Sequence, residues 1–382
     1  MIASNVLAGR GFLLDTYFQA YANVTPLYPA LLVVLRVLGL GPWGQIVVQA
    51  ALGAGTAVVA KRLAALLFGA RAGLFAGSLV AAYPYYVGHD TRLQETSLFT
   101  FLTASAVLAL YRARGDARLW RPLVAGILFG FAILTRASLA PFTATAVLWI
   151  AWDGAKLGGA GVGYRRGLQK AAAVALGAAI VVAPWLVRND RVVGAPVLTA
   201  QTGFFLWLAQ NDKTFTRYPE ESIDVTLREA MMATTDEEKA ELNEAARHGE
   251  LARSVWFAAK GRAHMAAHPG DALVGALRKN AAAFSPIMSP RRPARPWVLA
   301  AHALSYTPVV ALAAAGLVAA RRRLRDLVPF ALLFGTFVVA SGLFWAHTSH
   351  RVYLDVYLMV LAGHALASAK SLCSRVCQRP RT

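Results

Sequence analysis

The sequence predicts an all-α polytopic membrane protein, a bundle of about nine transmembrane helices with a helical extracytoplasmic domain. Hydrophobic residues make up 57% of the 382 residues and charged residues only 15%, which is too apolar for one soluble core. The basic residues behind the net charge of +19 fall in short clusters between apolar runs. Such clusters are typical of cytoplasmic loops, so we expect membrane lipids and no nucleic acid as partners of these charges.

Residues 1–43 are predicted to form juxtamembrane helices on the outer face. Asn5 to Tyr21 has the pattern of a short amphipathic helix and lacks the apolar core of a signal peptide. The apolar run from Pro26 to Gly41 has about 15 residues and would span roughly 22 Å, short of the ~30 Å hydrocarbon core. We therefore expect this run to lie in one leaflet.

Nine apolar runs follow, which predict an N-terminal transmembrane bundle at 44–187 and C-terminal transmembrane helices at 298–370. If all nine cross, about half of the 39 basic residues fall on one side, which must be the cytoplasm. The nine spans are expected at 44–60, 72–88, 94–111, 122–135, 138–152, 170–187, 298–320, 327–345 and 352–369. Residues 371–382 form a basic cytoplasmic tail, and its two cysteines are too few for a disulfide framework or a zinc site.

The long segment 188–297 is predicted to be a mostly helical extracytoplasmic domain, because twelve of the 20 acidic residues lie between Asp212 and Asp271. Thr235 and Glu238 form a capping box that opens a helix running through Leu242 and Val255 to His268. A second helix should follow Pro269.

The junction Pro184-Trp185-Leu186-Val187-Arg188-Asn189 separates the apolar runs from this polar segment. Proline and tryptophan suit the end of a helix at the membrane surface. A site that holds both a lipid tail and a charged head would be built at such a border. Alternatively, Trp185 and Arg188 only anchor the helix end.

The loops assigned to the outer side carry a short set of polar residues beside the spans. Arginines from several loops could converge on a lipid phosphate, and Asp90 or Glu95 could act as the base for a hydroxyl or amine acceptor. The alternatives are interfacial anchoring by Arg136 and Arg351, and a salt bridge from Asp90 or Glu95 to Arg92. We predict no certain cofactor, but His347 and His350 near Asp90 leave a divalent metal open.

Several motifs, taken in order, resemble the multi-spanning glycosyltransferases of the GT-C class, closest to protein O-mannosyltransferases and aminoarabinose-lipid A transferases. Each motif alone is loose, and their order carries the resemblance. They are Ala8-Gly9-Arg10-Gly11-Phe12, Thr25-Pro26-Leu27-Tyr28-Pro29, Leu66-Leu67-Phe68-Gly69, Ala82-Tyr83-Pro84, Glu95, the stretch from Gly130 to Arg136, Pro184-Trp185-x-x-Arg188-Asn189 and His350-Arg351-Val352-Tyr353.

The resemblance implies a GT-C-like bundle and an inverting transfer of sugar from a polyprenyl-phosphate carrier to an envelope acceptor, which could be a lipid, a glycan or a protein. The active site would face outward from the cytoplasmic membrane. Asp90 and Glu95 are the candidate catalytic residues, and Glu95 matches the acid of the second outer loop in the family. The candidate substrate-binding residues are Pro26, Tyr28, Arg92, Arg136, Arg188, Asn189, His350, Arg351 and Tyr353, with Arg188 and Arg351 expected on the carrier phosphate.

The chain also departs from the family pattern. Members begin with one more span and an outer loop whose acidic residue is the expected base, whereas this sequence starts just after that point. Asn23-Val24-Thr25 replaces a basic residue of relatives before the Pro-Leu-Tyr motif. We therefore expect poor transfer by the chain as written. The alternative is a catalytically degenerate lipid-binding or transport protein on the same scaffold, although no internal repeat of a transporter is visible.

Overall fold

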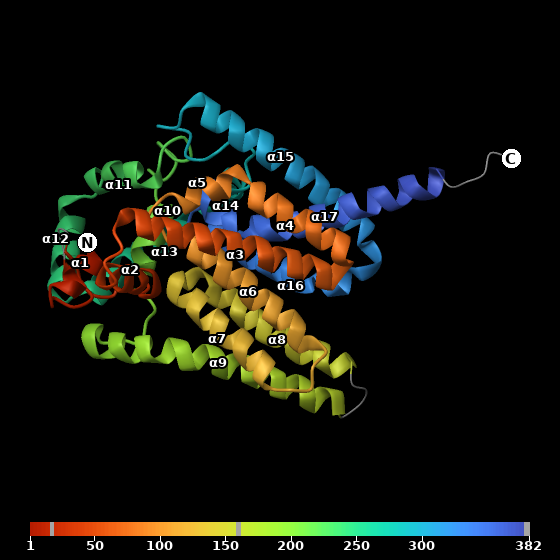
Figure 1. The fold of residues 1–382 in the computed structure, drawn as a ribbon. Helices are drawn as coiled ribbons and strands as arrows, with labels where there is room; N and C mark the ends of the chain where they lie inside the picture. Colours follow the sequence, from red (N-terminus) through yellow and green to blue (C-terminus); the bar gives the residue numbers. More distant parts are fainter. Residues whose placement is uncertain (16–18, 158–161, 378–382) are drawn as a thin grey trace.

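The computed structural model describes residues 1–15, 19–157 and 162–377, and it is an elongated bundle of helices (Figure 1). Among these residues the only strands are β1 (Leu14–Asp15) and β2 (Gln19–Ala20), which form one short antiparallel pair. The predicted all-α class is confirmed.

Six helical segments in the described residues are long and apolar enough to cross a membrane, so the chain is a multi-pass membrane protein. They are α3 (Pro42–Phe68), α6 (Thr96–Arg114), α9 (Val162–Val193), α15 (Pro296–Ala319), η2 with α16 (Arg321–Leu327 and Val328–Leu343) and α17 (Thr348–Cys377). The shorter apolar helices are α2 (Leu27–Val37), α4 (Ala70–Ala82) and α7 (Trp120–Thr135), and α8 (Ala140–Leu157) follows α7. Eight of the nine predicted spans thus correspond to one helix each, the span at 72–88 extends beyond α4, and the number that cross stays a prediction.

Three predicted helix boundaries are wrong. Of the described residues in 5–21, only those up to Leu7 are helical, as the end of α1 (Ile2–Leu7). Asn5 donates a hydrogen bond to the carbonyl of Leu13 (2.7 Å), so the chain turns back. The span predicted at 72–88 breaks at Tyr83, whose extended backbone precedes Pro84, the first residue of α5 (Pro84–Asp90). Helix α9 does not end at the Pro184 junction but continues to Val193, since one proline removes a single hydrogen bond.

The polar segment is helical, as expected. It contains α10 (Thr202–Ala209), α11 (Ile223–Met232), α12 (Asp236–Arg247), α13 (Glu250–Ala267) and α14 (Pro269–Ala283). The capping box of Thr235 and Glu238 is present. The helix predicted to run from Thr235 to His268 is instead broken at His248-Gly249 into α12 and α13.

Helices α10–α14 gather with α1 and α2 at one end of the bundle, on the left in Figure 1, and the C-terminus lies at the other end. The segment is fixed to α16 and its following loop by hydrogen bonds from Lys279 to Gly342 (3.1 Å), from Gln210 to Leu343 (2.7 Å) and from Tyr218 to Ala346 (2.5 Å), all to carbonyls. The exact domain boundaries, from 1–43 to 371–382, stay predictions, and residues 378–382 of the tail lie outside the described residues.

At the opposite end of the bundle, basic residues of three loops, Arg114, Lys170 and Arg323, form hydrogen bonds with neighbouring helices. Arg114 of α6 forms a bidentate pair with Asp153 of α8 (2.7 and 2.8 Å) and a third bond to Asp326 of η2 (2.5 Å). Lys170 of α9 donates to the carbonyl of Arg114 (2.7 Å), and Arg323 donates to the carbonyl of Leu67 in α3 (2.5 Å). These contacts agree with the expectation that the clusters share one side.

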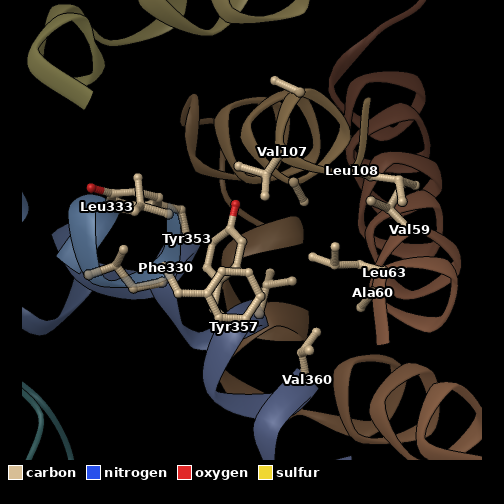
Figure 2. Packing of buried hydrophobic residues seen from close by; sticks show 14 of the residues in the cluster. Val59, Ala60, Leu63, Val107, Leu108, Phe330, Leu333, Tyr353, Tyr357 and Val360 are labelled. Atoms are coloured by element: carbon tan, nitrogen blue, oxygen red, sulfur yellow. The ribbon is translucent and has the colours of Figure 1, made fainter. Parts of the chain in front are cut away.

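Helix α17 runs through the centre of the bundle. Figure 2 shows the packing of its side chains among three other helices, with Tyr353, Tyr357 and Val360 of α17 beside Phe330 and Leu333 of α16, Val107 and Leu108 of α6, and Val59, Ala60 and Leu63 of α3. The start of α17 carries His350, Arg351 and Tyr353, so this packing places three of the predicted site residues in or beside the core.

Helices α7 and α9 cross at very short range through glycines. A methyl group on Gly126 of α7 would come within 2.0 Å of the carbonyl oxygen of Val174 in α9, and one on Gly177 of α9 would come within 2.3 Å of that of Leu123. Small residues four apart, here Gly126 and Gly130, allow helix backbones to approach closely in membranes.

The Gly126→Ala substitution should therefore lower the free energy of unfolding by about 1–3 kcal/mol, the cost of overpacking, although alanine is the better helix former. Thermal unfolding of the detergent-solubilised protein measures this change. Gly335→Ala in α16 is the matched control, because a methyl group there meets nothing within 4 Å. Equal melting temperatures for the two variants would contradict the close crossing.

Candidate active site

Polar side chains of α2, α3, α5, α6 and the turn after α7 meet at the end of the bundle that carries α10–α14. We call this set the polar cluster; it comprises Tyr28, Gln49, His89, Asp90, Glu95, Ser97 and Arg136. Gln49 is its connecting residue, since it accepts a hydrogen bond from the Tyr28 hydroxyl (2.7 Å) and donates to the carbonyls of Asp90 (3.0 Å) and Arg92 (2.6 Å). The turn between α5 and α6 is thereby fixed to α3 and α2.

Asp90 is the last residue of α5 and is held between α3 and α6. Ser97 donates a hydrogen bond to Oδ1 of Asp90 (2.5 Å). A Cβ atom added to Gly53 of α3 would lie only 2.0 Å from Oδ2 of Asp90. Burial raises the pKa of Asp90 above its ordinary value of 3.8, and the Ser97 hydrogen bond opposes this shift in part. Asp90 is therefore a stronger base than a solvated aspartate.

Beside Asp90 is a cavity of about 10 Å³, the size of one water molecule. Asp90, His89, Ser97 and Thr100 contribute to its walls. His89 has its Nδ1 against the Gln94 amide, while its buried Nε2 has no hydrogen-bond partner within the described residues. Burial, followed by the charges of Arg136 and Arg92, lowers the pKa of His89 to about 3, so the ring is neutral.

Glu95 forms an ion pair with Arg136, with 2.9 Å between Oε1 and Nε. Arg136 also donates to the Thr96 hydroxyl (2.9 Å) and lies over the Phe99 ring (5.0 Å). Burial is the largest influence on the pKa of Glu95 and raises it, but the charge and hydrogen bond of Arg136, together with a backbone hydrogen bond, give a net downward shift. The predicted alternative of a salt bridge to Arg92 is wrong: Arg92 is exposed, and no ion pair of its side chain exists among the described residues.

Arg351 lies in a second cluster that is fully enclosed. Its side chain is 0% exposed, and its guanidinium contacts Asp355 (2.6 Å), the carbonyl of Ala283 (2.6 Å) and His302 (3.3 Å). The face of the guanidinium lies 3.4 Å from the centre of the Tyr306 ring. This enclosure is at odds with the expectation that Arg351 binds the carrier phosphate directly.

The two clusters are neighbours. The Tyr85 ring contacts the rings of both His89 and His302, with centroids 4.6 Å apart in each case. Its hydroxyl is 2.8 Å from that of Thr348, the first residue of α17. The Tyr353 ring packs against the Phe99 ring (4.8 Å), and Arg136 lies over the same Phe99 ring.

The histidine pair considered for a metal does not form such a site. Ser289 and His347 share a hydrogen bond at Nδ1 (2.9 Å), the amide of Ile223 faces Nε2 (3.4 Å), and the amide of His347 donates to His350 (3.1 Å). Burial lowers the pKa of His347 to about 4. In the part of the chain that the structure describes, no group of three or more His, Cys, Asp or Glu residues could hold a metal ion.

Arg188 and Asn189 lie in the last turns of α9. Arg188 donates to the carbonyls of Tyr21 (2.6 Å) and Phe12 (3.2 Å) and lies over the Trp185 ring (4.8 Å). Asn189 is buried and donates to the carbonyl of Val197 (2.7 Å). These contacts tie the N-terminal segment and residues 195–200 to α9, which accords with the anchor alternative for this junction.

Of the predicted site residues, the polar cluster unites Tyr28, Asp90, Glu95 and Arg136, with Pro26 and Arg92 adjoining it in sequence. Gln49, His89 and Ser97 complete it and were not assigned to the site from the sequence. The sequence does contain an indication of Gln49: a side-chain amide inside an apolar span needs a hydrogen-bond partner.

The family model described as Dolichyl-phosphate-mannose-protein mannosyltransferase matches residues 23–187. The match supports the resemblance to GT-C glycosyltransferases over this segment, and it includes every residue of the polar cluster. A comparison of the sequence with curated proteins gives no match.

Two crystal structures of ArnT from Cupriavidus metallidurans show similarity to this chain. The one bound to undecaprenyl phosphate has 15% sequence identity and a TM-score of 0.38, over 99% of this chain and 74% of that chain. The apo structure has 18% identity and a TM-score of 0.41, over 100% of this chain and 75% of that chain.

The contact between Gly53 and Asp90 gives a direct test of the site geometry. Gly53→Ala should displace the Asp90 carboxylate and lower the free energy of unfolding by about 1–3 kcal/mol, opposite in sign to the usual gain from alanine in a helix. Gly88→Ala in α5 is the control, since a methyl group there meets nothing within 4 Å. If Gly53→Ala melts at or above the wild-type temperature, Asp90 does not pack against α3 as described.

Proposed function

We propose that this protein is a membrane glycosyltransferase that moves a sugar from a polyprenyl-phosphate carrier to an envelope acceptor, with the polar cluster as its active site. The observation that carries the proposal is the ion pair of Glu95 with Arg136 at the start of α6, beside the hydrogen bond of Asp90 with Ser97, inside the segment that the mannosyltransferase family model matches. A carboxylate base for the acceptor and a cation for the leaving phosphate are the groups that such a transfer requires.

The reaction would proceed by displacement at the anomeric carbon of the sugar. The acceptor oxygen or nitrogen forms the new bond while the bond between the anomeric carbon and the phosphate oxygen breaks, and polyprenyl phosphate leaves. Asp90 is our candidate for the base that receives the acceptor proton, because its raised pKa suits proton uptake better than the lowered pKa of Glu95.

Arg136 and Arg92 are our candidates for the cations that stabilise the leaving phosphate. Glu95 positions Arg136 through Nε, and no hydrogen bond to Nη1 of Arg136 occurs in the described residues. Arg92 is exposed at the adjoining turn. Guanidinium groups suit phosphate because their planar N–H groups bind two of its oxygens at once.

A second candidate function is lipid binding without transfer on the same scaffold. The cavity of about 10 Å³ beside Asp90 is too small for a sugar in this conformation, which argues against transfer without rearrangement of the site. A transfer assay with the purified chain, a polyprenyl-phosphate sugar and an envelope extract separates the two functions.

In that assay Asp90→Asn should lower kcat by roughly 10²–10⁴, the contribution of a positioned general base. The folded-state pKa of Asp90 lies above its ordinary value, so the ionised carboxylate costs free energy in the fold and a neutral amide should not lower the melting temperature. The acid limb of the wild-type pH–rate profile should lie above pH 3.8 and disappear in the variant.

Asp190→Asn is the matched control, since Asp190 is exposed near the same end of the bundle. Unchanged kcat in Asp90→Asn would exclude Asp90 as the base. A large loss of melting temperature would show that its role is structural.

We also propose that the polar cluster and α10–α14 face outward from the cytoplasmic membrane, as the positions of the basic clusters indicate. In a background with Cys373 and Cys377 replaced by alanine, a membrane-impermeant thiol reagent should label Ala240→Cys in α12 and should not label Arg322→Cys in η2. Labelling of Arg322→Cys alone in intact cells would reverse the orientation.

A further inference from the structure

We propose that a groove between α14 and the segment 285–291 binds a phosphate mono- or diester at the membrane surface. The groove encloses a cavity of about 320 Å³, large enough for a phosphate headgroup, and we call it the arginine groove because Arg278 and Arg291 line it. It is separate from the polar cluster and does not rest on the proposed transfer reaction.

The groove lies where the membrane helices meet the polar segment. Residues 285–291 follow α14 and lead to Pro296, where α15 begins. Ser289 exchanges hydrogen bonds with Thr348 at the start of α17: its amide donates to the Thr348 hydroxyl (3.2 Å), and its carbonyl accepts from that hydroxyl (3.0 Å). A lipid phosphate would lie at this level of the bundle.

Arg278 is the strongest feature of the groove. Its guanidinium lies 4.0 Å from the centre of the Phe215 ring, so stacking fixes the plane of the group. No hydrogen bond or ion pair of the Arg278 side chain occurs within the described residues, although Arg278 borders a cavity. A planar cation that is held in place and lacks a carboxylate is suited to bind an oxyanion.

Arg291 adds a second cation from the other wall. It pairs with Glu220 (3.0 Å), and the backbone amides of Arg291 and Arg292 both donate to the Glu220 carbonyl (2.9 Å each). The Arg292 and Arg295 side chains are exposed nearby, and neither has an ion pair among the residues that the structure describes. The rim therefore carries an excess of positive charge, and Glu220 competes with any incoming anion for Arg291.

The serines of the segment have different roles. Ser285 accepts from the amide of Ile287 (3.0 Å), and no acceptor for its own hydroxyl hydrogen occurs in the described part of the chain, so it can donate to a ligand. Ser289 donates to the carbonyl of Pro219 (3.1 Å) and so accepts from Nδ1 of His347 (2.9 Å). Two guanidinium groups and one hydroxyl supply more donors than the two oxygens of a carboxylate need, which favours phosphate.

The test uses the 382-residue protein in a maltoside detergent, which carries no phosphate. Calorimetric titration with inorganic phosphate measures the free anion, and titration with a short-chain phosphatidylglycerol measures the lipid-borne diester. Binding in either arm supports the groove, and the arm that binds identifies the source. Absence of binding in both arms overturns the proposal.

Substitutions assign the binding to the groove. Arg278→Gln should weaken the Kd at least about tenfold, the scale of a lost charge-assisted hydrogen bond. Phe215→Leu keeps the charge but removes the stacking surface, and should weaken the Kd by a few-fold. Arg262→Gln in α13 is the control, because Arg262 is exposed and does not line the groove.

Glu220→Gln gives the sharpest test, because it should tighten phosphate binding whereas the other substitutions should weaken it. Removing the carboxylate that competes for Arg291 should tighten the Kd by a few-fold while leaving the positive groups in place. Weaker or unchanged binding in Glu220→Gln, or wild-type affinity in a folded Arg278→Gln protein, contradicts the proposal.

Discussion

The buried ion pair between Arg351 and Asp355 is the interaction on which the arrangement of both candidate sites depends. Arg351 connects α17 to α14 through the Ala283 carbonyl and to α15 through His302 and Tyr306. Asp355 accepts a hydrogen bond from Tyr83 (3.3 Å), the residue between α4 and α5. Removing either charge would leave the other buried without a partner, which lowers the free energy of unfolding by an amount on the order of 3–5 kcal/mol.

This pair determines where the two candidate sites lie. Through Tyr83 it fixes the break between α4 and α5, and α5 in turn carries His89 and Asp90 into the polar cluster. Through Ala283 it fixes the end of α14, which forms one wall of the arginine groove. Arg351, which belongs to the motif His350-Arg351-Val352-Tyr353, therefore positions the elements around it.

The sequence was a good guide to features that depend on local pattern. Apolar runs gave the helices, and the Thr235 capping box was confirmed because its two hydrogen bonds involve residues only three apart. The partner of Glu95 was not predicted, since Arg136 lies 41 residues away and only folding brings them together. Arg351 and Asp355 are four residues apart on one helix, a spacing that predicts an ion pair. This spacing also indicates that the charge of Arg351 is already neutralised by Asp355.

The arginines of this protein fall into two groups: those paired with a carboxylate and those without such a partner among the described residues. Arg114, Arg136 and Arg351 each pair with an aspartate or glutamate and connect helices, so their charge serves the fold first. Arg92 and Arg278 have no such partner among the described residues, yet each lies beside a candidate site. A guanidinium near a membrane surface attracts anionic lipid. The arginines without a carboxylate partner are therefore a better indicator of where phosphate would bind than the sequence motifs are. Arg136 is already paired with Glu95 and Thr96, so in the proposed reaction it can bind phosphate only through its remaining N–H groups. Glu95 is then a positioning residue for Arg136. Asp90 is the carboxylate that remains available for proton transfer.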